Sequence, residues 1–144
     1  MTLRANNHKS NRDAPMIKCF SLSLLLLLIP ACSNELKGDL TLDGQAFELS
    51  SCRSGAIYGF VGVELVSKEG AKLRFAQTPT GEAVAFYLPE GKATGVEIGM
   101  CGSFSVSQQN STINDVKNVE GKGQMDCSAA GHTLKGSFKF SNCH

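Results

Sequence analysis

Residues 36–50 read LKGDLTLDGQAFELS and contain two runs in which apolar and polar residues alternate. Such alternation places every second side chain on the same face of an extended strand. The two runs flank Asp43-Gly44, and an Asp-Gly pair favours the two-residue turn of a β-hairpin because both turn positions need positive φ. The stretch therefore predicts strands over 36–42 and 45–50 that are joined by a tight turn, with Leu42 opposite Gln45.

The same kind of pattern continues to the end of the chain. Further alternating or apolar runs are separated by clusters of glycine, proline and small polar residues at intervals of about 8–12 residues. These runs predict strands over 61–65, 73–75, 83–88, 95–106 with a kink at Gly102, 113–127 and 132–140, with turns that include 109–112 and 128–131. No run after Cys32 keeps the helical period over ten residues. We therefore expect an all-β fold, a single small antiparallel meander of about eight strands that forms a sandwich or a closed barrel.

The charge of the chain restricts its partners. From Cys32 to His144 the chain has 113 residues with ten basic and twelve acidic side chains, which gives a net charge of about −2. A nucleic-acid-binding surface is typically basic, so this balance argues against a nucleic-acid partner. No run of neighbouring lysines or arginines follows Cys32, and the sequence therefore predicts no polybasic patch for lipid headgroups.

Residues 16–35 read MIKCFSLSLLLLLIPACSNE and have the order of an export signal. Lys18 precedes an apolar run from Phe20 to Ile29, which is about ten residues long. A membrane-spanning helix needs about twenty apolar residues, whereas the apolar part of a signal peptide needs roughly 7–15. The competing interpretation, a buried core helix with a chance cysteine, is disfavoured because no polar face interrupts the leucines.

The end of this segment, Ile29-Pro30-Ala31-Cys32, resembles the lipobox of bacterial lipoproteins, although Pro30 takes a place where a small residue is commoner. The resemblance implies that the chain is cleaved after Ala31 and that Cys32 carries acyl chains, which attach the protein to the membrane. It implies a lipid-anchored protein of the cell envelope, and Ser33 after the lipid site favours the outer membrane.

These features divide the chain into three parts. Residues 1–31 are expected to be a leader and lipoprotein signal peptide, and we interpret the polar residues 1–15 as an over-extended reading frame. Residues 32–35 are expected to be a lipidated tether, and residues 36–144 the all-β domain.

Four cysteines remain beyond Cys32, namely Cys52, Cys101, Cys127 and Cys143. An even number in an oxidising compartment predicts two disulfides. A zinc site is the weaker alternative, because no Cys-x-x-Cys pair occurs and the four are far apart in the sequence. We therefore expect neither a metal nor a cofactor.

The last predicted hairpin reduces the number of possible disulfide pairings, because it separates Cys127 from Cys143. Its phenylalanines favour a register with Phe138 opposite Gly121, which places Cys127 opposite His132 beside the turn. Cys143 would then lie eleven residues further on, roughly 36 Å away at about 3.3 Å per residue. A disulfide needs Cα atoms within about 7 Å. We therefore expect these two cysteines to bond with the two earlier ones, one with Cys52 and the other with Cys101.

No group of residues has the pattern of a catalytic site, and the sequence therefore predicts no enzyme. Ser128, His132 and Asp126 could be assembled on paper, but their spacing resembles no nucleophile elbow, and we interpret His132 as a solvated turn residue. Residues 55–63, GAIYGFVGV, are glycine-rich and apolar, which favours a core strand over a ligand-facing wall. We expect a non-catalytic binding or interaction module for an unknown protein partner. The alternative is a small β-barrel carrier of an apolar ligand.

Overall fold

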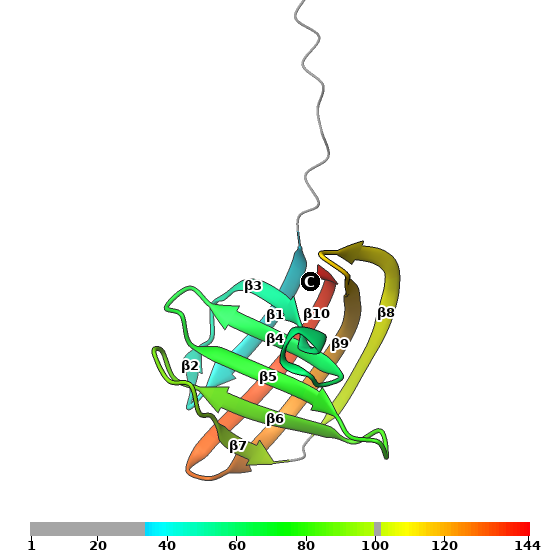
Figure 1. Ribbon diagram of the computed structural model, residues 1–144. Coiled ribbons are helices and arrows are strands. Elements are labelled where there is room, and N and C mark those ends of the chain that lie inside the picture. The colour runs from blue at the N-terminus through cyan, green and yellow to red at the C-terminus, as the bar shows by residue number, and fades with distance from the viewer. Residues whose placement is uncertain (1–33, 100–101) are drawn as a thin grey trace, which may run out of the picture. The chain divides into compact units, whose positions relative to one another are not determined.

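The computed structural model describes residues 34–99 and 102–144, which form two five-stranded antiparallel sheets (Figure 1). Sheet A contains, in spatial order, β2 (Gln45–Ala46), β1 (Glu35–Leu42), β10 (His132–Cys143), β9 (Val116–Ala129) and β8 (Ser103–Ile113). Sheet B contains β3 (Leu49–Ser54), β4 (Gly62–Ser67), β5 (Lys72–Gln77), β6 (Ala83–Leu88) and β7 (Val96–Gly99). A short 3₁₀ helix, η1 (Gly55–Tyr58), joins β3 to β4. The predicted all-β fold is confirmed.

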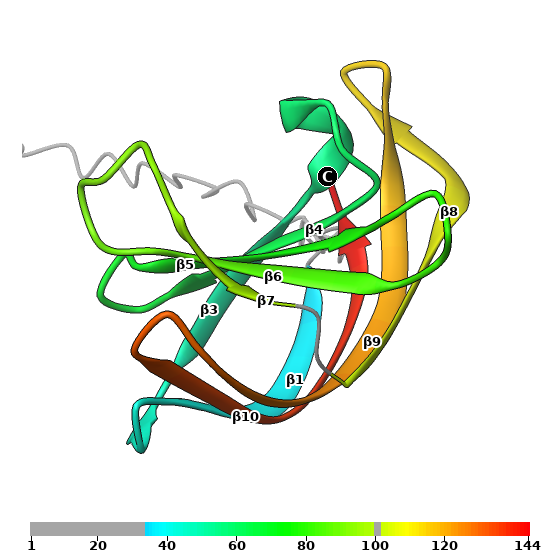
Figure 2. The ribbon, with the colours of Figure 1, turned by 90° about the horizontal axis from the view of Figure 1, so that it is seen from below.

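The order of the strands follows the order of the chain almost throughout. Sheet B is an uninterrupted meander, and in sheet A the pairing of β1 with β10 brings the first and last strands together. Figure 2 shows sheet A curving around one face of sheet B. The two sheets do not close into a barrel, so the closed-barrel alternative is wrong. The reason is that β2 does not pair with β3, nor β7 with β8.

The predicted Asp43-Gly44 turn is confirmed, but its hairpin is short. The two turn residues have φ of 54° and 77°, and Leu42 pairs with Gln45. Phe47 then donates a backbone hydrogen bond to β1 and buries its ring in the core, and the chain crosses to sheet B. The prediction of one strand over 45–50 is wrong for this reason.

The β8–β9 turn lies further along the chain than predicted. It consists of Asn114-Asp115, whose φ values are 50° and 63°. Residues 109–112, the predicted turn, instead form an irregular stretch inside β8 where the register shifts. A polar run is compatible with a bulge as well as with a turn, because its side chains face solvent in both.

The β9–β10 turn is shorter than predicted. It consists of Ala130-Gly131 alone, with φ of 51° and 80°, rather than of residues 128–131. Both positive φ values belong to the two-residue turn whose twist matches that of the flanking strands. The shorter turn moves the register by two residues, so that Phe138 lies opposite Gly123 and not opposite Gly121.

Phenylalanine rings fill the space between the sheets. Phe75 of sheet B lies against Phe138 of sheet A, with ring centroids 4.5 Å apart, and two further rings of sheet A, Phe104 and Phe140, continue the cluster. A Cβ atom at Gly123 would overlap the ring of Phe138, so the glycine makes room for the large neighbour on the next strand.

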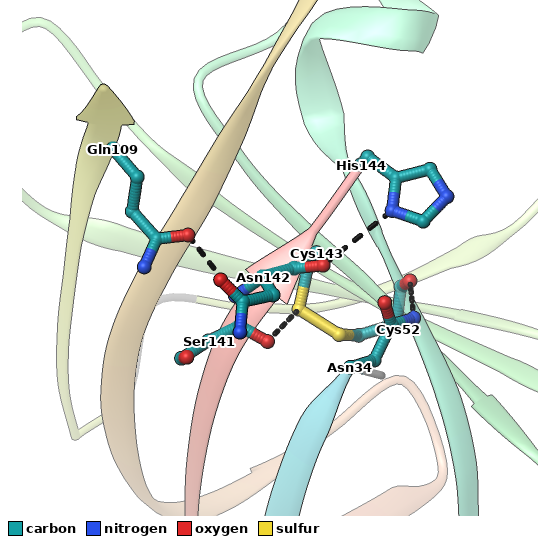
Figure 3. The surroundings of a disulfide bond; sticks show 7 residues. All are labelled: Asn34, Cys52, Gln109, Ser141, Asn142, Cys143 and His144. Atoms are coloured by element: carbon teal, nitrogen blue, oxygen red, sulfur yellow. Dashed lines mark hydrogen bonds between the residues drawn. A yellow bond between two sulfur atoms is a disulfide. The ribbon is translucent and has the colours of Figure 1, made fainter. Parts of the chain in front are cut away.

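One disulfide links the two sheets among the described residues. Cys52 of β3 bonds with Cys143 of β10 across 91 positions of sequence, with Cα atoms 5.2 Å apart (Figure 3). Asn34 donates a side-chain hydrogen bond of 3.0 Å to the carbonyl oxygen of Cys52, which ties the start of the domain to the same place. The expectation that Cys127 does not bond with Cys143 is confirmed. Cys101 lies outside the described residues, as do Cys32 and the whole signal segment.

Candidate functional site

The predicted turn residue His132 is half-buried and has a partner, so its interpretation as a solvated side chain is wrong. Its Nδ1 lies 2.8 Å from Oδ2 of Asp43, and its ring contacts the Tyr87 ring edge-on at 5.1 Å. The other Asp43 oxygen accepts the Thr133 backbone N–H at 2.8 Å. That hydrogen bond and then His132 lower the pKa of Asp43 below its ordinary value. The pair thus fastens the β1–β2 turn to the start of β10.

These contacts do not assemble a catalytic triad. Asp126, the acid of the Ser128–His132–Asp126 set considered above, forms an ion pair with Lys135 at 3.2 Å and not with His132. Ser128 lies opposite Thr133 in the β9–β10 ladder. Across residues 34–99 and 102–144 there is also no group of three histidine, cysteine or acidic side chains that could hold a metal ion.

The glycine-rich stretch 55–63 is not the predicted core strand. Residues 55–58 form η1, which begins after Ser54, whose hydroxyl accepts the Ala56 N–H, and which ends at Gly59 with φ of 80°. Only Gly62 and the buried Val63 of this stretch belong to a strand, β4. Gly55 must be glycine, because a Cβ there would overlap the ring of Phe60. The turn lifts the side chains of Ile57 and Tyr58 onto the outer face of sheet B, where they are 49% and 38% exposed.

A hydrogen-bonded network fixes Tyr58 on this face. Arg53, Glu64 and Arg74 lie opposite one another on β3, β4 and β5. The Tyr58 hydroxyl donates to Glu64 Oε1 at 3.0 Å and accepts from Arg53 at 3.2 Å. Arg74 Nε donates to Glu64 Oε2 at 2.7 Å, and its guanidinium lies over the Tyr58 ring, 4.4 Å from the centroid.

Glu64 is the centre of this network and is fully buried. A buried carboxylate needs several donors to offset its lost hydration, and Tyr58 and Arg74 supply them. The hydrogen bond to Tyr58 also raises the pKa of Arg53. The network therefore presents an aromatic ring and two cationic groups in one rigid arrangement, while its negative charge is hidden beneath them.

An apolar hollow of about 230 Å³ adjoins the network on the outer face of sheet B. Its lining is the Phe60 ring, the Arg74 side chain, and residues of β5, β6 and the loop before β7, namely Ala76, Phe86, Leu88 and Gly95. The neighbouring Val61 side chain is 65% exposed. We call the set Ile57, Tyr58, Phe60, Val61, Arg74 and Phe86 the Tyr58 cluster.

The composition of the Tyr58 cluster is suited to binding. Tyrosine, phenylalanine and arginine are enriched at the centres of protein interfaces, where they combine a large apolar area with a few directed polar contacts. The network does not have the arrangement of a nucleophile and its base. Tyr58 and Arg74 both donate hydrogen bonds to the Glu64 carboxylate, and Arg53 donates one to the Tyr58 hydroxyl.

Sequence reasoning did not find this surface. Its residues come from positions 57 to 86, and the four that lie within residues 55–63 were interpreted as part of a core strand. One signal was available: Glu64 interrupts an otherwise apolar run, and a hairpin around residues 68–70 would place it opposite Arg74. That Glu64 is buried depends on η1, whose Tyr58 lies over it and cannot be placed from the sequence.

The chain matches no protein family, no curated protein and no solved structure with which it was compared. In the part of the chain that the structure describes, no helix has the length and apolar character that crossing a membrane requires.

Proposed function

We propose that this protein is an acylated lipoprotein of the cell envelope whose β-sandwich binds another protein and catalyses no reaction. The resemblance of residues 29–32 to a lipobox supports the anchor and the compartment. The Cys52–Cys143 bond supports export, because structural disulfides are typical of oxidising compartments. Ser33 after the lipid site supports the outer membrane.

The observation that carries the binding proposal is the Tyr58 cluster. The Tyr58 ring and the Arg74 side chain are already fixed by Glu64, so binding a partner would cost this protein little conformational entropy. The accessible charges at the cluster are mainly cationic, from Arg53, Arg74 and the nearby Lys72, with Glu97 at the sheet edge. We infer a protein partner that places an apolar side chain in the hollow beside Phe86 and an acidic side chain near the arginines.

The open sandwich does not support the alternative of a small β-barrel carrier of an apolar ligand. It depended on a closed barrel with room inside, and the sheets form an open sandwich with four phenylalanine rings between them. Binding at the outer surface of sheet B is the better proposal.

A photo-crosslinking residue at position 57 tests the docking surface in cells that produce the full chain. We expect one adduct whose added mass differs from that of the chain, and we expect Phe86→Ser to abolish it without lowering the amount of folded protein. The same crosslinker at Thr80, an exposed loop position, is the control and should give no adduct. An adduct of twice the chain mass, or identical adducts from both positions, would refute the proposal.

Metabolic labelling with palmitate tests the anchor separately. The full chain should take up label and migrate as the processed form, whereas Cys32→Ala should take up no label and keep its uncleaved signal segment. An unlabelled chain would overturn the anchor but not the docking surface, since the crosslinking result does not depend on acylation.

We propose that the second disulfide joins Cys127 to Cys101. This pair completes the expectation that the two later cysteines bond with the two earlier ones, since Cys143 is bonded with Cys52. A peptide map of the non-reduced chain should contain a linked peptide pair with these two cysteines. A free thiol at Cys101 in the folded, non-reduced protein would contradict it.

A further inference from the structure

Three lysines stand in a row across the outer face of sheet A. Lys37 of β1 lies opposite Lys139 of β10, and Lys139 lies opposite Lys122 of β9. All three are exposed. Like charges directly opposite each other on neighbouring strands destabilise a sheet, so this lysine row opposes folding unless something neutralises it.

No acidic side chain among the described residues forms an ion pair with the lysine row. The neighbouring cation Lys135, on the same strand as Lys139, is different because it pairs with Asp126 at 3.2 Å. Lys68 is likewise paired, with Glu48 at 2.7 Å. Sheet A therefore neutralises Lys135, which has an acid opposite it, whereas each lysine of the row has another lysine opposite it.

The lysine row borders a surface hollow of about 530 Å³ that contains other hydrogen-bonding groups but no carboxylate in its lining. Ser103, Ser105, Ser137 and Gln124 line this hollow together with the three lysines. On the other side of the row lies a second hollow, of about 490 Å³, whose lining includes Glu35 and Glu120. The first hollow is therefore the one whose lining has positive charge and hydrogen-bonding groups without a carboxylate, although Asp39 lies opposite its lining residue Ser137.

We propose that the lysine row and the adjoining serines bind a phosphate-bearing ligand with two or more negative charges. Ammonium groups and hydroxyls are suitable donors to phosphate oxygens. Neighbouring strands are about 4.8 Å apart, so the three ammonium groups extend over roughly 10 Å, which suits a ligand with more than one charged phosphate oxygen. This site lies on sheet A and does not depend on the Tyr58 cluster of sheet B.

Calorimetry with inorganic pyrophosphate at low ionic strength tests the site. The processed chain without its acylated residue, Ser33 to His144, is used, because acyl chains and the apolar segment 20–29 would both bind to membranes by themselves. We expect measurable binding that weakens with added salt. Lys122→Gln should weaken it about fivefold, the loss expected for one surface cation, and replacement of all three lysines by glutamine should abolish it.

Lys135→Gln is the matched control, because it removes the same charge from the same sheet face but leaves the lysine row intact. It should leave the affinity unchanged within twofold. The lysine variants remove repulsion and should fold at least as stably as the parent chain, which thermal unfolding verifies. Equal losses from Lys122→Gln and Lys135→Gln would mean diffuse attraction and would overturn the proposal.

Vesicles distinguish the source of the phosphate. The same chain is mixed with phosphatidylcholine vesicles that contain or lack phosphatidylglycerol, and the bound fraction is measured by sedimentation. Binding to the anionic vesicles but not to pyrophosphate would assign the site to a lipid headgroup, and the reverse would assign it to a soluble phosphorylated compound. The absence of binding to both would refute the site.

Discussion

At the scale of single residues, glycines allow the strands of sheet A to approach closely. Gly136 of β10 has φ of 119° and lies opposite Leu40 of β1. A Cβ atom there would overlap the carbonyl oxygen of Asp39. A side chain at this position would therefore lower the stability of the fold in two ways, through an unfavourable φ and through an overlap with the backbone of β1.

We expect Gly136→Ala to lower the free energy of unfolding by about 3 kcal/mol, as the sum of a φ penalty of about 1 kcal/mol and an overlap penalty of about 2 kcal/mol. Gly44→Ala is the control, because Gly44 has φ of 77° with no atom near its missing Cβ. It should cost about 1 kcal/mol. Denaturant unfolding measures both, and equal losses would show that the overlap is relieved by a shift of β1.

The Asp43 carboxylate makes a second residue-scale prediction, which concerns pH. The Thr133 N–H and then His132 lower the pKa of Asp43 in the folded protein. The stability that this group contributes is therefore complete above its ordinary pKa and is lost as the pH falls through the lowered pKa. A carbon NMR titration should give a midpoint below the ordinary value for an aspartate.

The variant His132→Ala distinguishes the effect of the Thr133 hydrogen bond on the pKa of Asp43 from the effect of His132. Since the Thr133 hydrogen bond is the larger one, the midpoint of Asp43 should stay below its ordinary value in this variant, but by less than in the parent chain. A midpoint at the ordinary value in the parent chain would show that the Asp43–Thr133 contact does not persist in solution.

At the scale of elements, the register of β9 against β10 decides which charges meet. In the register expected from the phenylalanines, Lys139 would face Glu120, an ordinary cross-strand ion pair. The two-residue turn at Ala130-Gly131 moves Lys139 opposite Lys122 instead. A shift of two residues keeps every side chain on its own face, so the core pattern does not distinguish the two registers.

Lys122→Glu tests this register through stability. In the observed register the new carboxylate lies between Lys139 and Ser105 and replaces a repulsion by an attraction. The free energy of unfolding at low ionic strength should rise by about 0.5–1 kcal/mol, and the gain should shrink with added salt. In the other register Lys122 would face Ser137, and the substitution would then change stability little.

At the scale of the whole molecule, the Cys52–Cys143 bond joins sheet B to the last strand of sheet A. It crosses the side of the sandwich where the chain changes sheets after β2, and where no backbone ladder connects the sheets. The bond is therefore a covalent link between two sheets that share no backbone ladder.

Removal of this bond should have a large effect on stability. The bond closes a loop of 91 positions, and the chain-entropy model assigns a loop of this length roughly 4–5 kcal/mol. The double variant Cys52→Ala/Cys143→Ala should lose about that much in denaturant unfolding. The dependence of the unfolding free energy on denaturant concentration is compared between the two proteins, because it would reveal a change in the unfolded state. A loss of stability under 1 kcal/mol would contradict the prediction.

The sequence alone predicted the features that depend on close neighbours in the chain. The alternation of residues 36–42 predicted a strand, Asp43-Gly44 predicted the turn, and the strand at 83–88 was placed correctly. Each follows from the φ preferences and the two-residue period of a few consecutive residues. The separation of Cys127 from Cys143 also followed, because it needs only the length of a strand.

Only the tertiary structure decided which distant residues face one another. The open sandwich, the burial of Glu64 under η1 and the row formed by Lys37, Lys139 and Lys122 all depend on strand pairing and on packing between sheets. Registers two residues apart bury the same apolar faces, and turns of two or four residues fit the same polar stretch. The choice between them rests on the free energy of the whole packed core, which no single strand determines.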